Sequence, residues 1–399
     1  RAQYESKEIP GNAKVEAGSM APDGDSPLMT ALKGTKFSGF VDAGYEFGFN
    51  SLHASPTTNP GPADRLFDNR GHSFYLNSVQ LNVERLADEK MIIGYHLELA
   101  AGHDVGIYNG GLFPATGGVL GDQVGLQEGW VQILAPVGSG LDIRIGKMAT
   151  LVGYEVLESK DDFNYSRGLL FSFIQPFTHT GIRASYNVNE MISGTIGFSN
   201  GLNALDGYSD FDHGKQFEAQ VAIKPTKDAL VSATILVGNE TNPGGVFGSF
   251  SSNDKYYVFD IVASFTMDKL TLGLNLDWSS IEGVLGAAPG ARSPMSGFAV
   301  YAKYSWTDAM ASALRLEYMS DGEGRIFTQQ SGGATAVGTD TGSGSRLVEV
   351  TLTQEMKVAQ QLILRVELRS DNSNNHNFVR DGKNARGDTT LGFEAIMPF

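Results

Sequence analysis

The stretch TTLGFEAIMPF, residues 389–399, ends the chain and places an apolar side chain at every second position: Leu391, Phe393, Ala395, Met397 and Phe399. Successive side chains of a β-strand point to opposite faces of the sheet, so this alternation predicts a strand with one apolar face. A final strand that alternates in this way and ends on an aromatic residue is typical of a membrane β-barrel. The end of the chain therefore predicts the last strand of a closed sheet.

The same alternation recurs through the chain, for example in the apolar row at 270, 272, 274, 276 and 278. It predicts about sixteen strands, which start near residues 36, 74, 90, 126, 141, 177, 191, 214, 229, 256, 270, 297, 310, 346, 361 and 388. The connections alternate between short turns and long segments rich in Gly, Asn and Asp. An even strand number with short turns at one end and long loops at the other predicts an all-β, antiparallel transmembrane barrel.

Composition agrees with this fold class. The chain has 399 residues, 49 Gly and only 41% hydrophobic residues, and it contains no run of about 18 apolar residues that a transmembrane helix would need. A barrel needs no such run, because only alternate residues face lipid. The net charge of −15 argues against a nucleic-acid partner, and the absence of Cys is common outside the cytoplasm.

Residues 1–33 differ from the rest because they are charged, carry Pro and Gly, and lack alternation. We expect a flexible periplasmic arm in this region and a barrel over residues 34–399. Both ends of the barrel chain would then lie in the periplasm, with the long connections outside the cell.

The third long connection, about residues 149–176, mixes acidic residues with apolar ones such as Val152, Tyr154 and Val156. A purely solvated loop would not need these apolar side chains, so we expect this connection to fold into the barrel and narrow it. Its charged residues would face inward-pointing arginines of the wall. The predicted constriction comprises Glu155, Glu158, Lys160, Asp161, Asp162 and Arg167, with Arg144, Arg183, Arg315, Arg365 and Arg369.

Sixteen strands enclose an aqueous channel, so the sequence predicts a pore for small hydrophilic solutes and ions. Acidic residues exceed basic ones on the predicted inner face, which favours a weak preference for cations. We expect no cofactor, no metal and no enzymatic activity. The expected partners are outer-membrane lipid and lipopolysaccharide, and further copies of the chain in a homotrimer.

Other classes of function remain open at this point. An outer-membrane enzyme would need a nucleophile and a general base together, whereas the seven His are scattered and no zinc-binding spacing occurs. A barrel that encloses a partner protein is a further alternative. Oxygen-rich loops at 206–212 and 371–388 would suit Ca²⁺, although solvated turns explain the same residues.

Three segments carry a resemblance to a known family. They are SGFVDAGYEFGFN at 38–50, LAPVGSGLDIRIGK at 134–147 and GYEVLESKDDFNYSRGLLFSFIQPFTHTGIRASY at 153–186. They resemble the putative β-barrel porin-2 family, the OmpL-like outer-membrane porins, over most of residues 35–399. The resemblance implies a diffusion porin of a Gram-negative outer membrane and no particular substrate. It also implies that Glu155, Glu158, Lys160, Asn164, Tyr165, Ser166 and Arg167 belong to the distinctive loop of the family.

Overall fold

The structure is a computed structural model that describes residues 33–50, 65–68, 71–108, 123–201, 214–240, 243–245, 248–249, 254–282, 292–323, 344–359, 361–380 and 383–399. The arm expected at residues 1–33 lies outside these ranges apart from Lys33. Among the described residues, no helix is long and apolar enough to cross a membrane.

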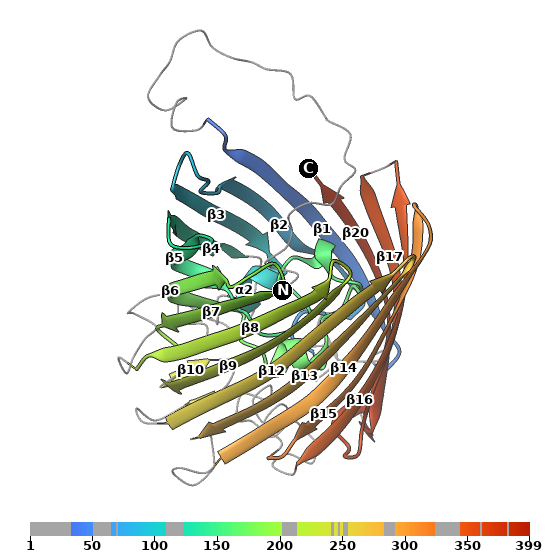
Figure 1. The fold of residues 1–399 in the computed structure, drawn as a ribbon. Coiled ribbons are helices and arrows are strands. Elements are labelled where there is room, and N and C mark those ends of the chain that lie inside the picture. Colours follow the sequence, from blue (N-terminus) through green and yellow to red (C-terminus); the bar gives the residue numbers. More distant parts are fainter. Residues whose placement is uncertain are drawn as a thin grey trace.

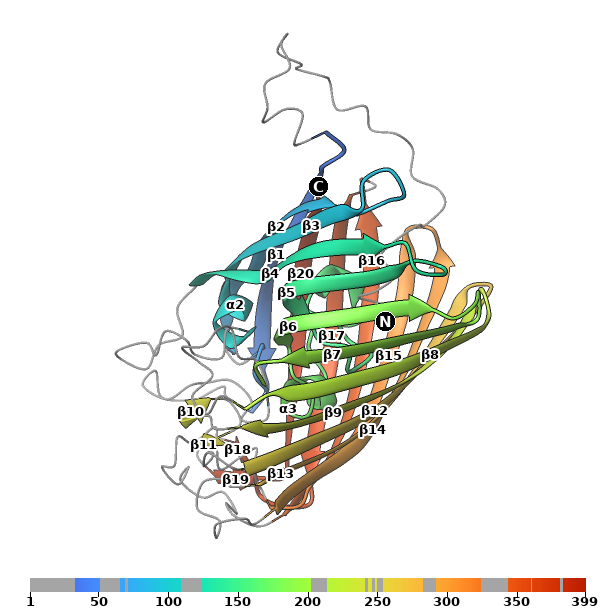
Figure 2. The same ribbon diagram turned by 60° about the vertical axis from the view of Figure 1, so that its left-hand side comes forward.

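Sixteen antiparallel strands form a closed barrel in which each strand pairs with its neighbours in chain order (Figures 1 and 2). The strands are β1 (Lys36–Gly48), β2 (Ser73–Arg85), β3 (Ile93–Gly102), β4 (Gln123–Ala135), β5 (Leu141–Ala149), β6 (Thr178–Asn187), β7 (Ile192–Ser199), β8 (Gln216–Thr226), β9 (Ala229–Glu240), β12 (Asp254–Met267), β13 (Leu270–Glu282), β14 (Arg292–Thr307), β15 (Met310–Asp321), β16 (Ser345–Val358), β17 (Leu362–Ser373) and β20 (Gly387–Pro398). The predicted fold class, strand number and approximate strand starts are confirmed.

Short elements occupy some of the connections. These are α2 (His103–Tyr108), η1 (Ser159–Asp161), α3 (Leu169–Phe173), and the two small hairpins β10 (Pro243–Gly245) with β11 (Gly248–Ser249) and β18 (Phe378–Arg380) with β19 (Lys383–Ala385). The barrel itself therefore contains all the long strands, and the connections carry the helices.

The barrel closes where the last strand pairs with the first. The register of β1 and β20 runs from Phe40 opposite Pro398 to Gly48 opposite Thr390. The terminal residue extends this ladder, because Gly39 and Phe399 exchange two backbone hydrogen bonds of 2.9 Å. A side chain at Gly39 would not fit, since a Cβ there would lie 2.6 Å from the Phe399 ring. The terminal aromatic predicted as part of the closing strand thus completes the ring of strands.

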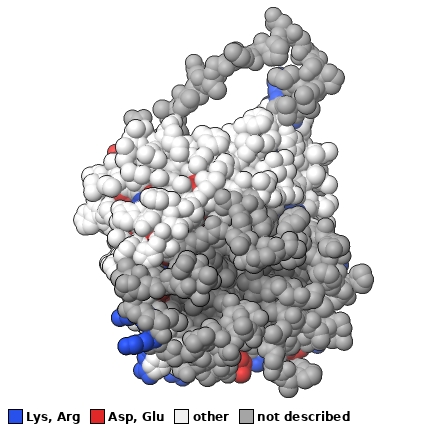
Figure 3. Space-filling model, turned by 180° about the vertical axis from the view of Figure 1, so that it is seen from behind, with Lys and Arg blue, Asp and Glu red and all other residues white. Residues whose placement is uncertain are grey.

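The two faces of the strands have opposite chemistry. Along β13, Leu272, Leu276 and Trp278 are exposed, whereas Asn275 and Asp277 between them are buried. The same alternation holds in β20, where Phe393 and Met397 are exposed and Glu394 is buried. The described outer wall in Figure 3 is mostly free of charged side chains over its upper part. An apolar outer face with a polar inner face is the arrangement required of a barrel in lipid.

Aromatic side chains lie at the barrel end near the short turns. Phe37, Trp306 and Phe399 are all more than half exposed there. A β-bulge shifts the alternation of β2, because Ser78 is opposite Asp42 whereas Leu76 is opposite Ala43. Tyr75 therefore faces inward although Leu81 and Phe74 are exposed, and its hydroxyl lies 2.6 Å from that of Tyr165.

The assignment of faces can be tested at Leu276, which lies near the middle of β13 and faces outward. We expect Leu276→Arg to lower the free energy of unfolding by about 2–4 kcal/mol in lipid vesicles, because a cation near the bilayer midplane must leave water. Urea titration measures this loss. The control Leu276→Met keeps an apolar side chain and should unfold close to the wild-type midpoint. Equal stability of the Arg variant would show that this face does not meet lipid.

Candidate functional site

Residues 150–177, between β5 and β6, form the most distinctive connection in the barrel. We call this segment the third loop. In Figures 1 and 2 it lies within the ring of strands as the green coil that contains α3. Most of its side chains are buried, including Leu157, Asn164 and Phe171. Its contacts are with inward-facing side chains of strands from several sides of the barrel, which the following paragraphs describe in turn.

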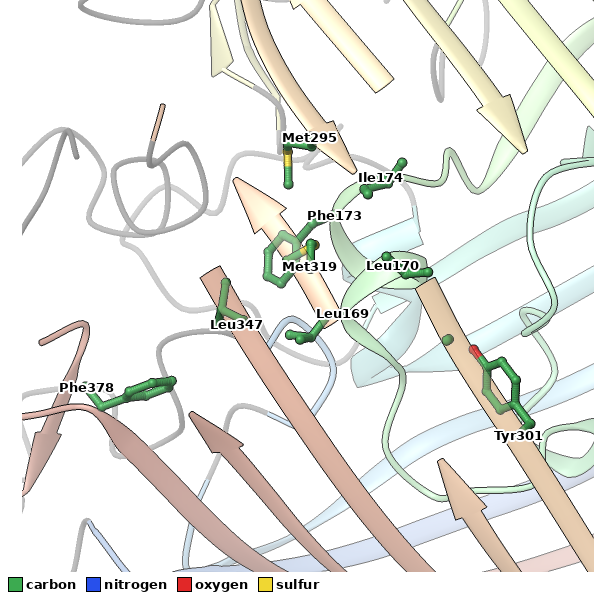
Figure 4. Close-up of a cluster of buried hydrophobic side chains, with 10 residues drawn as sticks. Leu169, Leu170, Phe173, Ile174, Met295, Tyr301, Met319, Leu347 and Phe378 are labelled. Atoms are coloured by element: carbon green, nitrogen blue, oxygen red, sulfur yellow. The ribbon is translucent and has the colours of Figure 1, made fainter. Parts of the chain in front are cut away.

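One side of the third loop packs against an apolar patch on β14, β15 and β16. Leu169, Leu170, Phe173 and Ile174 come from the loop, and they meet Met295, Met319 and Leu347 on the wall. Figure 4 shows this cluster with Tyr301 below it. Inward-facing Met and Leu side chains would be unfavourable in a water-filled lumen. The loop removes them from water by covering this part of the wall. Burial of these side chains contributes at roughly 25 cal/mol per Å² of apolar surface.

Inward-facing glycines allow the loop to approach the wall closely. The Tyr165 ring lies over Gly44 of β1 and Gly392 of β20, and a Cβ at either glycine would come within 2.6 Å of that side chain. Tyr154 covers Gly273 of β13 in the same way, with 2.4 Å to a Cβ placed there. Glycine within a strand often marks a point of close approach. These positions explain why two aromatic rings of the loop fit against a sheet.

Three buried arginines of the wall bind backbone carbonyls of the loop. Arg315 donates to the carbonyl oxygen of Ser166 at 2.6 Å. Arg365 donates to the carbonyls of Ser159 at 2.9 Å and Asp162 at 2.7 Å, and Arg369 donates to that of Arg167 at 2.6 Å. The side chains of Arg315, Arg365 and Arg369 are at most 1% exposed. We call Arg315, Arg365 and Arg369 the arginine ladder.

Carboxylates balance the arginine ladder and hold backbone N–H groups of the loop. Glu155 of the loop forms an ion pair of 2.6 Å with Arg315 and accepts the Gly168 N–H at 2.7 Å. Glu317 accepts the Leu169 N–H at 2.6 Å, at the start of α3. Glu367 accepts the N–H groups of Tyr165 and Ser166 at 2.7 and 3.0 Å. Charge-assisted bonds of this kind are stronger than neutral ones.

Three predicted arginines, Arg167, Arg183 and Arg144, lie outside the arginine ladder. Arg167 forms an ion pair of 3.1 Å with Asp162 and donates to the Leu157 carbonyl. Arg183 pairs with Glu218 at 2.8 Å and donates to the Ala149 carbonyl at 3.0 Å. Arg144 is away from the loop: it pairs with Asp142 at 3.0 Å and lies 4.3 Å from the centroid of the Trp130 ring. The structure thus brings all the predicted residues except Arg144 to the third loop or its attachment.

The contacts between loop carboxylates and wall arginines differ from those expected from the sequence. The sequence predicted acidic groups of the loop facing arginines across an opening. In the structure, Glu155 and Arg315 are in direct contact and both are almost fully buried. Such a pair fixes the position of the loop and presents little charge to a passing solute.

The tip of the loop carries the charges that keep contact with solvent. The Asp161 side chain is 42% exposed and that of Lys160 is 25% exposed, and the two form an ion pair of 2.5 Å. Glu158 next to them is partly buried. Its burial, and then the nearby carboxylates of Glu98 and Glu128, raise the pKa of Glu158 well above its ordinary value. The tip therefore lies close to acidic residues of β3 and β4.

Inward-facing side chains on the wall opposite the tip keep partial exposure. Inward-facing Glu84 of β2, His96 of β3 and Arg144 of β5 have side chains that are 23%, 12% and 19% exposed. Inward-facing Gln216 of β8, Asp260 of β12 and Asn275 of β13 are completely buried. Part of the water-accessible lumen is thus on β2–β5; Lys303 of β14, whose side chain is 21% exposed, is also accessible.

Sequence reasoning missed several residues that hold the loop. The alternating pattern gave no signal that Glu317, Glu367 and Asn275 would accept backbone N–H groups of the loop. Asn275 accepts the Tyr154 N–H at 3.1 Å. The inward glycines were the available signal, because Gly interrupts the alternation at Gly273 and Gly392. His179 is also buried, between Thr150 and Gln216 at 3.1 Å from each.

Comparison with known proteins places the chain among porins. The family described as "putative beta-barrel porin-2, OmpL-like" matches residues 34–399. No curated protein matches. Among solved structures, OmpT of Vibrio cholerae has a TM-score of 0.55 at 12% identity, covering 92% of this chain and 97% of its own. An anion-selective porin from Comamonas acidovorans has a TM-score of 0.55 at 11% identity, over 92% and 99%. Pseudomonas putida OprB has 0.55 at 13%, over 93% and 96%.

The contact between Glu155 and Arg315 predicts a local effect on the loop. Replacing Glu155 by Gln removes one of the carboxylates around Arg315, which keeps Glu349 at 3.2 Å, and replaces the charged acceptor of the Gly168 N–H by a weaker neutral one. We therefore expect Glu155→Gln to increase hydrogen exchange at the amides of Gly168 and Leu169, while the strands keep their protection. Asp161→Asn is the matched control, because Asp161 is exposed, and it should leave exchange in the loop unchanged. Unchanged exchange in Glu155→Gln would contradict a structural role for this pair.

Asp162 predicts a pH dependence. Burial raises its pKa from 3.8 to about 7, against the opposing charge of Arg167. A carboxyl whose pKa is raised in the folded state stabilises that state below pH 4, and this contribution is lost as the pH rises through 7. The measured quantity is the free energy of unfolding of the wild type minus that of Asp162→Asn. This difference should decrease as the pH rises from 4 to 7, by at most about 1.4 kcal/mol per pH unit. Urea titrations across this range measure it. A difference that is flat or rises with pH would show that Asp162 is ionised throughout.

Proposed function

The chain belongs to the putative β-barrel porin-2, OmpL-like family and is an outer-membrane porin; on this premise we propose that small hydrophilic solutes and ions diffuse passively through it. The observation that carries the proposal is the third loop, which attaches to one side of the lumen and leaves partly exposed polar side chains on β2–β5. A passive pore needs a wetted path of this kind and no energy-coupling machinery.

The narrow part of the path lies, in this proposal, between the loop tip and the wall of β2–β5. Glu158, Lys160 and Asp161 line it from the loop. Glu84 and Glu128 line it from the wall, together with Asp142 and Arg144. The arginine ladder and its carboxylates hold the tip in place but do not line the path, because their side chains are buried. This divides the residues predicted from the sequence into a holding set and a lining set.

A weak preference for cations follows from the lining set. Its acidic residues outnumber Lys160 and Arg144, while the buried arginines are paired and contribute little to the field that a solute meets. One solved porin of similar fold is described as anion-selective, but at 11% identity the likeness extends to the fold alone. The sign of the selectivity depends on the side chains of this chain.

A homotrimer embedded in outer-membrane lipid and lipopolysaccharide is the proposed assembly. Its support is indirect: Vibrio cholerae OmpT, with a TM-score of 0.56 and 12% identity, is described in a trimer form. Native mass spectrometry of the folded protein in detergent would give the number of chains. The alternatives of a barrel enzyme or a sheath for a partner protein are not favoured, since the family match is to porins.

Reversal potentials in a planar bilayer with a salt gradient test the proposal. We expect the wild type to form discrete channels with a cation preference, and the double variant Glu158→Gln, Asp161→Asn to shift the reversal potential towards anions. The shift should be larger at 0.1 M salt than at 1 M, because the Debye length falls from about 10 Å to about 3 Å.

Glu89→Gln is the matched control for this measurement. Glu89 is exposed in the turn between β2 and β3, so it should leave selectivity unchanged. A wild type without channels would overturn the proposed diffusion function. If channels form but the double variant leaves their selectivity unchanged, the tip does not line the narrow part of the path.

A further inference from the structure

Three side chains on β3 and β4 bring potential metal ligands together inside the barrel. A ring nitrogen of His96 and one carboxylate oxygen each from Glu98 and Glu128 lie within 4.8 Å of one another. The register explains this: Glu98 is directly opposite Glu128, and His96 is two residues from Glu98 on the same face. The cluster lies on the wall that the loop tip faces.

Each of these side chains is oriented by a further contact. The Nδ1 atom of His96 is 3.2 Å from Glu84 Oε2, and the imidazole stacks on the Trp130 ring at 5.0 Å between centroids. The Trp130 indole N–H donates to Glu128 Oε2 at 3.0 Å. A histidine whose second nitrogen is held by a carboxylate, with its free nitrogen turned to further ligands, is the usual arrangement around a protein-bound metal ion.

The atoms that point into the cluster lack other partners. His96 Nε2 and Glu98 Oε1 are buried without a hydrogen-bond partner, and the Glu98 side chain is only 1% exposed. His96 Nε2 lies 3.6 Å from Glu98 Oε2, which is beyond a hydrogen bond but close to the spacing of two ligands on one metal ion. Bonds of about 2.0–2.2 Å in a tetrahedral site put ligand atoms about 3.3–3.6 Å apart.

Glu98 and Glu128 carry like charges at directly opposite positions. Like charges directly opposite each other on one face of a sheet are destabilising. Some buried carboxylates on the covered side are paired with arginine, as Glu349 is with Arg315 at 3.2 Å and Glu394 with Arg365 at 3.0 Å, whereas Asp260 and Asp277 face each other as a second carboxylate pair. Within the described ranges, no Lys or Arg nitrogen comes within 4.0 Å of a carboxylate oxygen of Glu98 or Glu128. Lys147 and Lys160 act on this cluster only from a greater distance.

We propose that His96, Glu98 and Glu128 bind a divalent transition-metal ion of the Zn²⁺ type, with Glu84 orienting His96. One imidazole nitrogen and two carboxylates suit Zn²⁺ or Co²⁺, whereas Ca²⁺ and Mg²⁺ prefer sites made of oxygen alone. The cation also offsets the repulsion between the two facing carboxylates. Because the site lies opposite the loop tip, a bound ion would change the charge of the lumen at its accessible side. Sequence reasoning predicted no metal, since these ligands do not form a linear zinc motif.

Isothermal titration of the folded, full-length barrel in detergent with Zn²⁺ tests the site without relying on transport. We expect one Zn²⁺ per chain, a loss of affinity of at least tenfold in Glu128→Gln and in His96→Gln, and a smaller loss in Glu84→Gln. Ca²⁺ at a large excess over Zn²⁺ should not displace it. Glu282→Gln is the matched control, because Glu282 is at the far end of β13. The resistance of the barrel to unfolding in unheated detergent confirms that each variant is folded.

The same barrel with Co²⁺ gives a second readout, since visible absorption of bound Co²⁺ reports the ligand set. We expect a spectrum that His96→Gln alters and Glu282→Gln does not. Zinc affinity and Co²⁺ spectra that are unchanged in His96→Gln and Glu128→Gln would overturn the proposal, as would equal displacement by Ca²⁺. Because both readouts concern binding, a barrel that binds Zn²⁺ but forms no channel would contradict the proposed function and leave the metal site in place.

Discussion

Closure of the sheet between β1 and β20 is the constraint on which the rest of the structure depends. Backbone N–H and C=O groups have no water to bind in the hydrocarbon region, so every strand must have two neighbours. The final residues meet this need, because the ladder of β20 continues to Phe399 and its partner Gly39. Once the ring is closed, alternation along each strand gives lipid an apolar surface and gives the interior a polar one. The interior then has to accommodate many charged groups.

The interior accommodates these charges mainly through the third loop. The arginine ladder binds loop carbonyls, and Glu317 and Glu367 bind loop N–H groups. These side chains of the wall thus provide hydrogen bonds that regular secondary structure would otherwise provide within the loop. Apolar contacts around Leu169 and Leu170 add to this attachment. The same groups have two effects: they satisfy the backbone of a segment without regular structure, and they remove most buried charge from the path of a solute. In the proposed pore, the charges left for the lumen include those of the tip and of β2–β5.

The strand pattern was predictable because it depends on a period of two that lipid enforces over the whole barrel. The starts of β1, β5, β9, β13 and β15 are those predicted from the sequence, and the outward row of β13 is as expected. What the sequence could not supply were contacts between distant segments. The inward side chain of Tyr75 follows a β-bulge in β2, and its partner Tyr165 lies in a loop 90 residues away. The arginines of the ladder were expected to face carboxylates across water, yet they contact carboxylates directly and also bind main-chain carbonyls of the loop. The sequence pattern does not indicate which main-chain carbonyls a side chain will bind. The cluster of His96, Glu98 and Glu128 was not predicted for the same reason, since its residues come from two different strands.

The central claim is that the third loop holds its tip in the path of permeating ions. The chain has no native Cys, so a single cysteine can be placed at one position and modified with a charged thiol reagent during a bilayer recording. The account predicts that a positively charged reagent changes the current through Asp161→Cys channels within the recording and leaves Leu276→Cys channels unaffected. Modification of Asp161→Cys, verified by mass, with no change in current would contradict the account.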